Sequence, residues 1–517
     1  MRIARNLFGQ ISSLSSSKRN IVANYANFTL LGVLNFLISP HLLSHLGVIE
    51  FGLWKTSLRY LEFASTADGR SSQALKWIIA FSAGRASGDR NRRSVGASLF
   101  IWLCCVPILL LVLGLIIYIV PHAMHGLTAG QFILVRWTCT ILAANVILAA
   151  ILGLPDAVLT GSNQGFRSMN INSCMLIITN IAMVLAVFYG SGIISLAVIT
   201  FLGAVMSGFL TWRVARRRIS WWGIERPARD DVRSVWGFTG WTMAWSFVQL
   251  LLLSTELLLI AYLLGAGSVT AYTFTSYGVQ FALSMCLLTT SAVTPGIAAL
   301  LGREAFLEAG AMVKQTREIV LGIATLAGAG VLLYNRAFVT LWAGSESFMG
   351  SGANAGMVVA FVQLALIRCE AQMQDAGLKI SLKVALGAVG SFFALGLGWL
   401  AYRVTGSVEM LFVGICLGRA GISIMFPVFV NRLYRLQSFP MLRLMAVGAL
   451  LAACFMLGLF LNIGSWVELI LTALISLVFL VPIVLVTVLS STARRRLASV
   501  WLSGEKMMAS EKQIDRS

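Results

Sequence analysis

Charge is scarce in this sequence. Only 11% of its 517 residues are Asp, Glu, Lys or Arg, whereas soluble domains contain about 25%. Proline is also infrequent, with 9 residues, and no segment is polar enough over a sufficient length to form a sizeable soluble domain. Hydrophobic residues make up 58% of the chain instead. These proportions exclude a soluble enzyme and a single-span receptor, and they predict an all-α polytopic membrane protein.

The motifs of common enzyme classes are missing as well. The sequence contains no HExxH, no GxSxG, no phosphate-binding P-loop and no GxGxxG after an expected strand. Its 8 cysteines include no CxxC pair and lie in apolar runs, so neither a metal site nor a disulfide framework is expected. We therefore expect a protein that is not an enzyme and holds no cofactor. The alternative from another class is a membrane glycan polymerase or ligase, but the longest expected outer segment, 344–354, carries Glu346 as its single charge.

Long apolar runs predict about fourteen transmembrane helices between residues 20 and 491, because one span needs about 20 mostly apolar residues. Most of the 39 Lys and Arg residues fall in alternate connections. This pattern predicts that these connections and both termini are cytoplasmic. It also explains the net charge of +19 without nucleic acid. The basic segments are 2–19, 85–93, Arg167, 213–233, 303–317, 379–383, 432–443 and 494–516.

A faint internal repeat suggests two halves. A Leu-Gly pair followed by an aromatic residue occurs at Leu46-Gly47 with Trp54, and again at Leu264-Gly265 with Tyr272. Because six expected spans separate the copies, the repeats are parallel, as in transporters with two lobes around a central cavity. We expect an N-lobe at 1–225 and a C-lobe at 226–436, each of six helices. Two accessory helices and a basic cytoplasmic tail would follow at 437–517.

The second expected span, 52–83, carries a stripe of polar residues. On a continuous helix with about 100° per residue, seven side chains fall within about 60° of one direction. They are Lys55, Arg59, Glu62, Thr66, Arg70, Gln73 and Lys76. A charge at the bilayer centre costs from about 3 to above 10 kcal/mol, so such a stripe faces a partner or a cavity. A ladder of ion pairs, such as Arg59 with Glu62, is one explanation, but the excess of cations favours a water-filled groove that carries an anion.

Other expected spans contain further charges. Arg136, Arg368 and Arg419 would add cations to the same cavity. An intramembrane carboxylate is a candidate site for a coupling proton or cation. Glu256 fits this role best, followed by Glu62 and Asp375, although an ion pair with an arginine of another span is an equal explanation for the last two.

Several short motifs resemble the bacterial polysaccharide (O-antigen-type) flippases of the MOP exporter superfamily. The matching residues are Leu46-Gly47-x-x-x-Phe51-Gly52-Leu53-Trp54, Asp68-Gly69, Ala74-Leu75-Lys76, Thr255-Glu256 and Thr294-Pro295. The similarity in architecture extends over about residues 20–435. Arg70 departs from the family, whose members are usually apolar at this position. This departure makes the expected cavity more basic.

The resemblance implies an alternating-access flippase for surface polysaccharide biosynthesis, O-antigen or exopolysaccharide, in the bacterial inner membrane. Its substrate would be an oligosaccharide on undecaprenyl diphosphate, moved from the cytoplasmic to the outer leaflet. Independently, arginine binds diphosphates through bidentate hydrogen bonds. We expect the substrate to be bound by Arg59, Arg70, Arg368 and Arg419 and guided by Lys55, Lys76 and Arg136. Expected partners are H⁺ or Na⁺, membrane lipids and a glycan polymerase or export machinery.

Two alternatives lie within the same superfamily. A lipid II flippase handles a similar diphosphate lipid, so charge does not distinguish it from the first hypothesis. A cation-coupled exporter of small, often cationic molecules is less favoured, because a basic cavity would repel its cargo.

Overall fold

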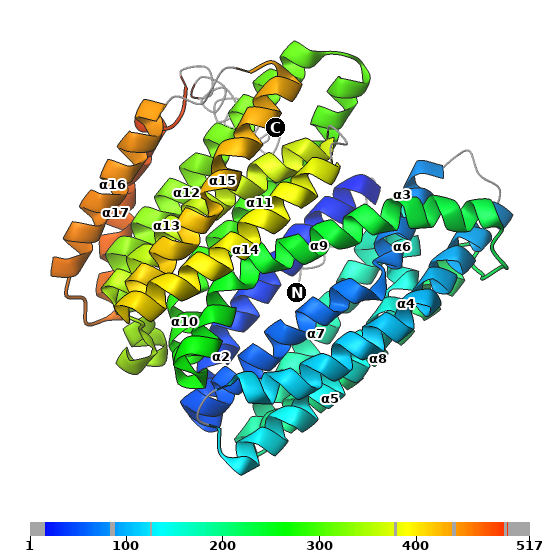
Figure 1. Cartoon of the computed structure of the whole chain (residues 1–517), viewed down its shortest axis with the longest axis horizontal. Coiled ribbons are helices and arrows are strands. Elements are labelled where there is room, and N and C mark those ends of the chain that lie inside the picture. The colour runs from blue at the N-terminus through cyan, green and yellow to red at the C-terminus, as the bar shows by residue number, and fades with distance from the viewer. Residues whose placement is uncertain are drawn as a thin grey trace, which may run out of the picture. The chain divides into compact units, whose positions relative to one another are not determined.

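The computed structural model describes residues 16–82, 88–124, 127–376, 380–436, 441–490 and 494. Of the predicted basic segments, residues 2–15, 85–87, 379, 437–440 and 495–516 therefore lie outside the described residues. The described part forms helices without strands, and 13 helices are long and apolar enough to cross a membrane. The chain divides into two compact units, unit 1 (Met1–Thr270) and unit 2 (Ala271–Ser517) (Figure 1). The prediction of an all-α polytopic membrane protein is confirmed.

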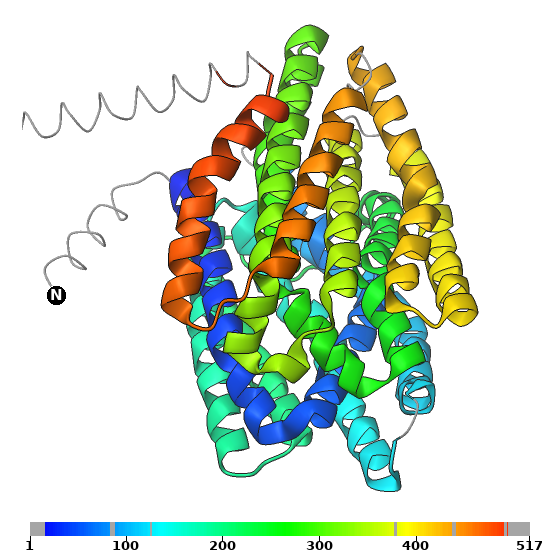
Figure 2. The same ribbon diagram turned by 90° about the vertical axis from the view of Figure 1, so that its left-hand side faces the viewer.

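The helix α2 (Ser16–Ala64) contains two membrane crossings. Its 49 residues would extend over about 74 Å, more than twice the hydrocarbon thickness of about 30 Å. Gly47 interrupts it with φ 77° and ψ 168°, a conformation that an α-helix does not contain. Figure 2 shows this blue helix reversing its direction. Because α2 crosses the membrane twice, the 13 helices account for the expected number of about fourteen crossings.

Unit 1 is a bundle in which α2, α5 and α7 pack against α8, and α4 lies beside α5 (Figure 1). After α2 its elements are η1 (Ser65–Asp68), α3 (Ser71–Ser82), α4 (Gly88–Ala123), α5 (Ala129–Leu152), α6 (Leu154–Gly161), α7 (Gly165–Phe188), α8 (Ile193–Arg218) and α9 (Arg229–Leu264). The helix α9 packs against α3 and α4, so the structure groups it with unit 1. The lobe boundary inferred from the repeat, between residues 225 and 226, stays a prediction.

The two copies of the repeat share their backbone conformation. Gly47 has φ 77° and ψ 168°, and Gly265, which ends α9, has φ 83° and ψ −179°. The aromatic residues that follow them, Trp54 and Tyr272, are each 3% exposed. A positive φ is accessible mainly to glycine, which explains why both reversals use Gly.

The segments after these two glycines touch through their backbones. A Cβ atom at Gly52 would lie 2.0 Å from the carbonyl oxygen of Ala266, at the start of α10 (Ala266–Thr275). Thr270 Oγ1 donates a hydrogen bond of 2.7 Å to the carbonyl oxygen of Val48. All four residues belong to unit 1. Glycine at position 52 is therefore a packing requirement.

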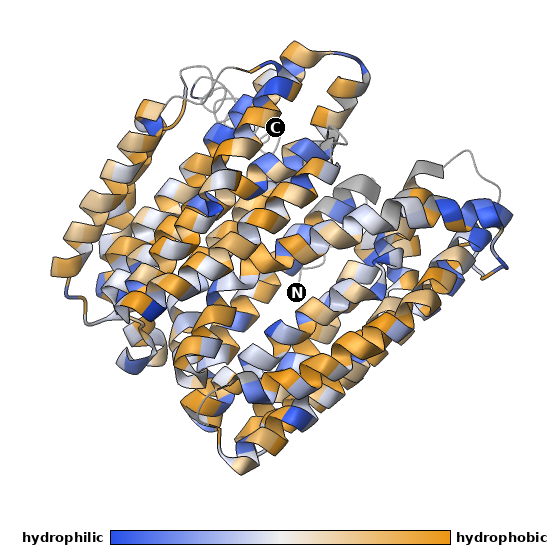
Figure 3. Cartoon of the chain, in the orientation of Figure 1, coloured by the Kyte–Doolittle hydropathy of each residue, from blue (hydrophilic) through white to orange (hydrophobic). Residues whose placement is uncertain are grey.

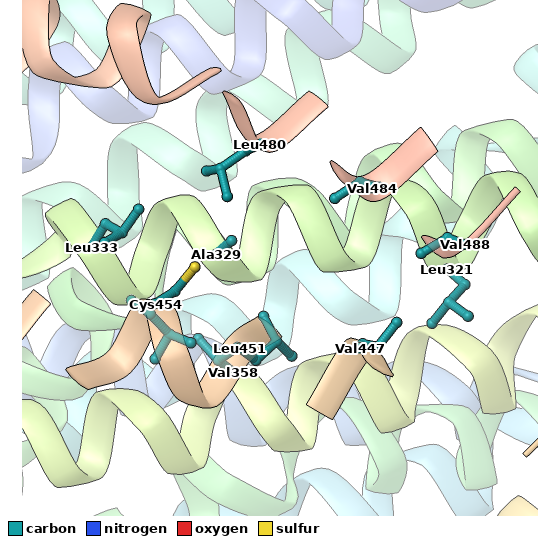
Figure 4. Close-up of a cluster of buried hydrophobic side chains, with 11 residues drawn as sticks. Leu321, Ala329, Leu333, Val358, Val447, Leu451, Cys454, Leu480, Val484 and Val488 are labelled. Atoms are coloured by element: carbon teal, nitrogen blue, oxygen red, sulfur yellow. The ribbon is translucent and has the colours of Figure 1, made fainter. Parts of the chain in front are cut away.

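Unit 2 is built around its longest helix, α12, which packs against α11, α13, α16 and α17. Its elements after α10 are α11 (Tyr277–Gly302), α12 (Phe306–Ala343), η2 (Ser345–Ser347), α13 (Ser351–Ala376), α14 (Ile380–Thr405), α15 (Val408–Tyr434), α16 (Met441–Phe460) and α17 (Trp466–Thr487). A cluster of buried apolar side chains packs between α12, α13, α16 and α17 (Figure 4). Figure 3 shows that α16 and α17 are mostly hydrophobic along their length, as lipid-facing helices must be.

A buried carboxylate fastens the accessory helices α16 and α17 to α12. The Glu318 side chain is 1% exposed and accepts a hydrogen bond of 2.8 Å from Arg443 of α16. Ser490, which follows α17, donates to the same carboxylate from its backbone nitrogen (3.0 Å) and its hydroxyl (2.7 Å). Glu318 thus holds both accessory helices with one side chain.

The Gly52 contact makes a testable prediction. Gly52→Ala places a methyl group against a backbone oxygen that has no room to move, and overpacking of this kind costs about 1–3 kcal/mol or more. Gly114→Ala in α4 is the matched control, because a Cβ there has no neighbour within 4 Å. We expect a lower melting temperature for the first variant in detergent and an unchanged or higher one for the second. Equal melting temperatures would contradict the proposed packing.

Candidate functional site

The second span is broken within its polar stripe. The helix α2 ends at Ala64, the single turn η1 follows, and Gly69 and Arg70 then have φ values of 79° and 43° before α3 begins at Ser71. The prediction of one continuous helix over 52–83 was therefore wrong. Since two left-handed residues change the chain direction, the polar side chains of α2 and those of α3 do not share one straight helical face.

Local interactions explain the break. The Asp68 carboxylate accepts a hydrogen bond of 2.8 Å from the backbone nitrogen of Arg70, which is the bond pattern of an Asx turn. The hydroxyl of Thr66 donates to the carbonyl oxygen of Phe63 at 2.7 Å. A Cβ at Gly69 would approach Cys105 Sγ to 2.8 Å, so glycine serves both the left-handed backbone and the contact with α4. The Asp-Gly dipeptide is a turn signal. The assumption of a continuous helical period through the polar stripe did not take it into account.

Arg70 combines a strained backbone with unused hydrogen-bonding capacity. Left-handed φ is uncommon for a residue with a side chain, and such strain gathers at functional sites. The Arg70 carbonyl caps α3 by accepting from the backbone nitrogens of Gln73 (3.0 Å) and Ala74 (3.2 Å). Its Nε atom is buried and has no hydrogen-bond partner among the described residues. The Nε–H group at the break therefore has the capacity for one further hydrogen bond.

The other predicted residues of unit 1 differ in environment. Arg59 lies about 18 Å along the helix from Gly47. It pairs with Glu62 at 2.8 Å, and the two side chains are 24% and 49% exposed. Lys55 lies over the Phe51 ring, with Nζ 5.2 Å from its centroid. Two more predicted residues stand elsewhere: half-buried Lys76 on α3 and exposed Arg136 on α5. The ion-pair explanation of the stripe therefore holds for Arg59 and Glu62.

In unit 2 the predicted cations are buried. Arg368 of α13 is 4% exposed and Arg419 of α15 is 0% exposed. The two helices are joined near Arg419, because Gln363 Nε2 donates to the Cys416 carbonyl (2.9 Å) and to Ser423 Oγ (3.1 Å). These arginines belong to the packed interior of unit 2.

Two ion pairs between helices of unit 2 were not predicted, and one of them is buried on both sides. Arg317 of α12 contacts Glu370 of α13 at 2.6 Å and donates to Asn431 Oδ1 at 2.6 Å. Lys383 of α14, 0% exposed, pairs with Asp375 of α13. Arg317 and Lys383 are the last residues of two basic segments, 303–317 and 379–383, that we assigned to cytoplasmic connections. Their partners lie on other helices, so spacing along one helix gives no signal for either pair.

The predicted carboxylates also separate into two kinds. Glu62 pairs with Arg59 of its own helix, and Asp375 pairs with Lys383 of α14, so neither carboxylate has the arginine of another span that the sequence suggested. Glu256 lies on α9, where it is partly exposed and follows the fully buried Thr255. The described residues contain no group of His, Cys, Asp or Glu side chains arranged to hold a metal ion.

Comparisons with known proteins agree with this architecture. Residues 105–346 match the family model described as "Polysaccharide biosynthesis protein". The structure of a lipid II flippase MurJ in an inward closed conformation superposes with a TM-score of 0.67 and 14% identity, over 92% of this chain and 100% of that one. The chain has the MOP-superfamily fold. The resemblance noted in the sequence is confirmed.

Further MOP structures match as well. An inward-facing multidrug resistance MATE family transporter has a TM-score of 0.60 and 17% identity, over 81% of this chain and 95% of that one. A MOP superfamily transporter from Pyrococcus furiosus has a TM-score of 0.58 and 16% identity, over 84% and 96%. No curated protein matches the sequence. The named structures are those of transporters and a flippase rather than enzymes, and this chain is a multi-pass membrane protein of their fold.

The buried pair in unit 2 provides a stability prediction. Glu370→Gln leaves the Arg317 charge buried with the neutral Asn431, and loss of one partner of a buried pair costs about 3–5 kcal/mol. The measurement is the unfolding free energy in detergent, with the exposed Glu308→Gln on α12 as the control. The double variant Arg317→Met/Glu370→Leu should recover much of the loss. If Glu370→Gln behaves like the control, the pair does not stabilise unit 2.

Proposed function

We propose that this protein is a flippase for an oligosaccharide linked to undecaprenyl diphosphate. It carries this substrate from the cytoplasmic to the outer leaflet of the bacterial inner membrane by alternating access, with both termini in the cytoplasm. The product would feed surface polysaccharide synthesis through a glycan polymerase or export machinery. The family match over 105–346 and the MOP fold support a flippase or transporter at the coarser level.

The observation that carries the proposal is Arg70 at the break between η1 and α3. Broken helices in transporters commonly mark substrate sites, because their irregular backbone is tolerated only in protein interiors or next to water. The strained Arg70 presents a buried guanidinium nitrogen without a partner among the described residues. A diphosphate is the kind of anion that a guanidinium binds with two parallel hydrogen bonds. We therefore assign the diphosphate to Arg70.

The neighbouring charges support an anionic cargo. Lys55, Arg59 and Arg70 carry three positive charges, and Glu62 and Asp68 offset two of them. The net charge of these five residues is +1, which does not favour a small cationic molecule. Lys76 and Arg136 would guide the head group, whereas Arg368 and Arg419 are buried in unit 2 and are assigned no part in binding.

A lipid II flippase is the second candidate, because the MurJ structure matches along its full length. Its substrate is also a diphosphate lipid, so the two candidates predict the same role for Arg70. They differ in the lipid-linked sugar that accumulates when the protein is absent.

Arg70 can be tested without disturbing its backbone. Arg70→Gly keeps the left-handed conformation and removes the guanidinium, so we expect folded protein at wild-type level with transport reduced at least tenfold. Arg59→Ala should also abolish transport. Arg336→Ala on α12, an exposed arginine, is the matched control. Normal transport by Arg70→Gly and Arg59→Ala would refute an anion site at the break.

The assay measures undecaprenyl diphosphate-linked oligosaccharide and its leaflet in cells that lack the protein or carry a variant. Accumulation on the cytoplasmic leaflet with loss of the surface polymer supports the flippase and identifies its sugar. Accumulation of lipid II indicates the second candidate instead. Unpolymerised units on the outer leaflet would indicate an assembly enzyme, and an unchanged lipid-linked pool would indicate an exporter of small molecules.

We further propose Glu256 as the residue that couples transport to H⁺ or Na⁺. The support for this role is the position of the carboxylate within a membrane-spanning helix, where an acidic residue commonly marks a proton or ion site. Glu256→Gln should leave substrate binding in place while transport in proteoliposomes stops responding to an imposed H⁺ or Na⁺ gradient. Glu308→Gln is the control. A variant that still follows the gradient would exclude Glu256 from coupling.

A further inference from the structure

Two arginines lie over one aromatic ring in unit 1, and a third interacts electrostatically with one of them. The guanidinium carbons of Arg19 and Arg167 lie 5.5 Å and 5.0 Å from the centroid of the Phe166 ring. Arg218, the last residue of α8, interacts electrostatically with Arg167, as Arg19 does. We name Arg19, Arg167 and Arg218 the arginine cluster. Its members come from the first turns of α2 and α7 and from the last turn of α8.

Hydrogen bonds hold the helix ends that carry the arginine cluster. Asn20, next to Arg19, donates from Nδ2 to Asn163 Oδ1 at 2.8 Å. Its Oδ1 accepts a bond of 2.7 Å from the backbone nitrogen of Phe166. The start of α2 is therefore fixed to the start of α7, and the positions of Arg19 and Arg167 on the Phe166 ring follow from this connection.

The charges of the arginine cluster are unfavourable by themselves. Arg167 lies in the first turn of α7, at the positive end of the helix dipole, where an anion is stabilised and a cation is not. Its Nε donates to the neutral Gln164 side chain at 3.1 Å. In contrast, the basic residues Arg92 and Arg93 have Asp89 and Asp231 at 3.8 Å and 3.7 Å. Among the described residues no carboxylate forms a salt bridge with Arg167 or Arg218.

The surroundings of the arginine cluster are those of a lipid boundary. One turn after Arg19, Val22 on the same helix is 41% exposed. Trp212 of α8 is 38% exposed, and its ring lies 5.7 Å from the guanidinium carbon of Arg216. Exposed aromatic and basic residues at the ends of spans are typical of the membrane interface, where basic side chains meet anionic lipid headgroups.

We propose that the arginine cluster is a binding site for the phosphate of an anionic phospholipid. The phosphate lies among the guanidinium groups of Arg167, Arg218 and Arg19, near the N-terminus of α7, while the acyl chains follow the apolar surfaces of α2 and α8. The bound anion offsets both the mutual repulsion of the arginines and the unfavourable position of Arg167. This site is separate from the substrate site proposed around Arg70, and its existence does not depend on the transported molecule.

The test is native mass spectrometry of the purified full-length protein in detergent with added phosphatidylglycerol or phosphatidylcholine. The variant is Arg167→Gln/Arg218→Gln. The control Arg226→Gln/Arg229→Gln removes the same charge from two exposed arginines, one in the connection between α8 and α9 and one at the start of α9. We expect the wild-type protein and the control to retain at least fivefold more phosphatidylglycerol than phosphatidylcholine. The variant should lose most of this preference, and Arg167→Lys/Arg218→Lys should keep part of it.

Equal lipid retention by the wild-type protein and the Gln variant would overturn the proposal. Melting temperature and helical content identify a variant that does not fold, in which case the single change Arg167→Gln provides the comparison. Two further probes distinguish sources of phosphate. Displacement of phosphatidylglycerol by an equal concentration of inorganic phosphate, or a preference of the cluster for undecaprenyl phosphate over phosphatidylglycerol, would each refute a phospholipid site.

Discussion

The cost of placing charge in hydrocarbon governs the interior of this protein. A single cation near the bilayer centre costs from about 3 to above 10 kcal/mol, so each must be compensated nearby. The charge of Arg59 is compensated by Glu62 of the same helix, and that of Lys55 by the face of an aromatic ring. The charge of Arg317 is compensated by Glu370 of a neighbouring helix. Arg70 lies beside Asp68, which offsets its charge, but its buried Nε has no hydrogen-bond partner among the described residues. A substrate anion that binds at the break would supply this missing acceptor.

Features that depend on composition and short spacing could be predicted from the sequence. Apolar run length was sufficient to predict the spans, because each helix must cover the hydrocarbon layer with its own residues. The Leu-Gly repeat correctly identified two equivalent reversals, since Gly47 and Gly265 adopt nearly the same positive-φ conformation. The pairing of Arg59 with Glu62 could also be predicted, because residues three positions apart lie on one helical face.

Other features depend on information that hydropathy and helical period do not contain. The break at Gly69 and Arg70 was overlooked because an ideal helical period was extended through an Asp-Gly turn signal. Arg317 and Glu370 are 53 residues apart, so their contact results from the packing of α12 on α13 rather than from local spacing. For the same reason Lys383 was assigned to a connection although it is 0% exposed.

The adjacent residues Arg317 and Glu318 have a consequence for biogenesis. On α12 they point to different neighbours: Arg317 contacts α13, while Glu318 contacts Arg443 and Ser490, which follow 125 and 172 residues later. During synthesis, α12 must therefore enter the membrane before the groups that neutralise and cover Glu318 exist. Its carboxylate then has to be held by water, protons or the insertion machinery until α16 arrives. The accessory helices thus complete the folding of unit 2. The Glu318 carboxylate gains its hydrogen-bond partners only when this last part of the chain has been made.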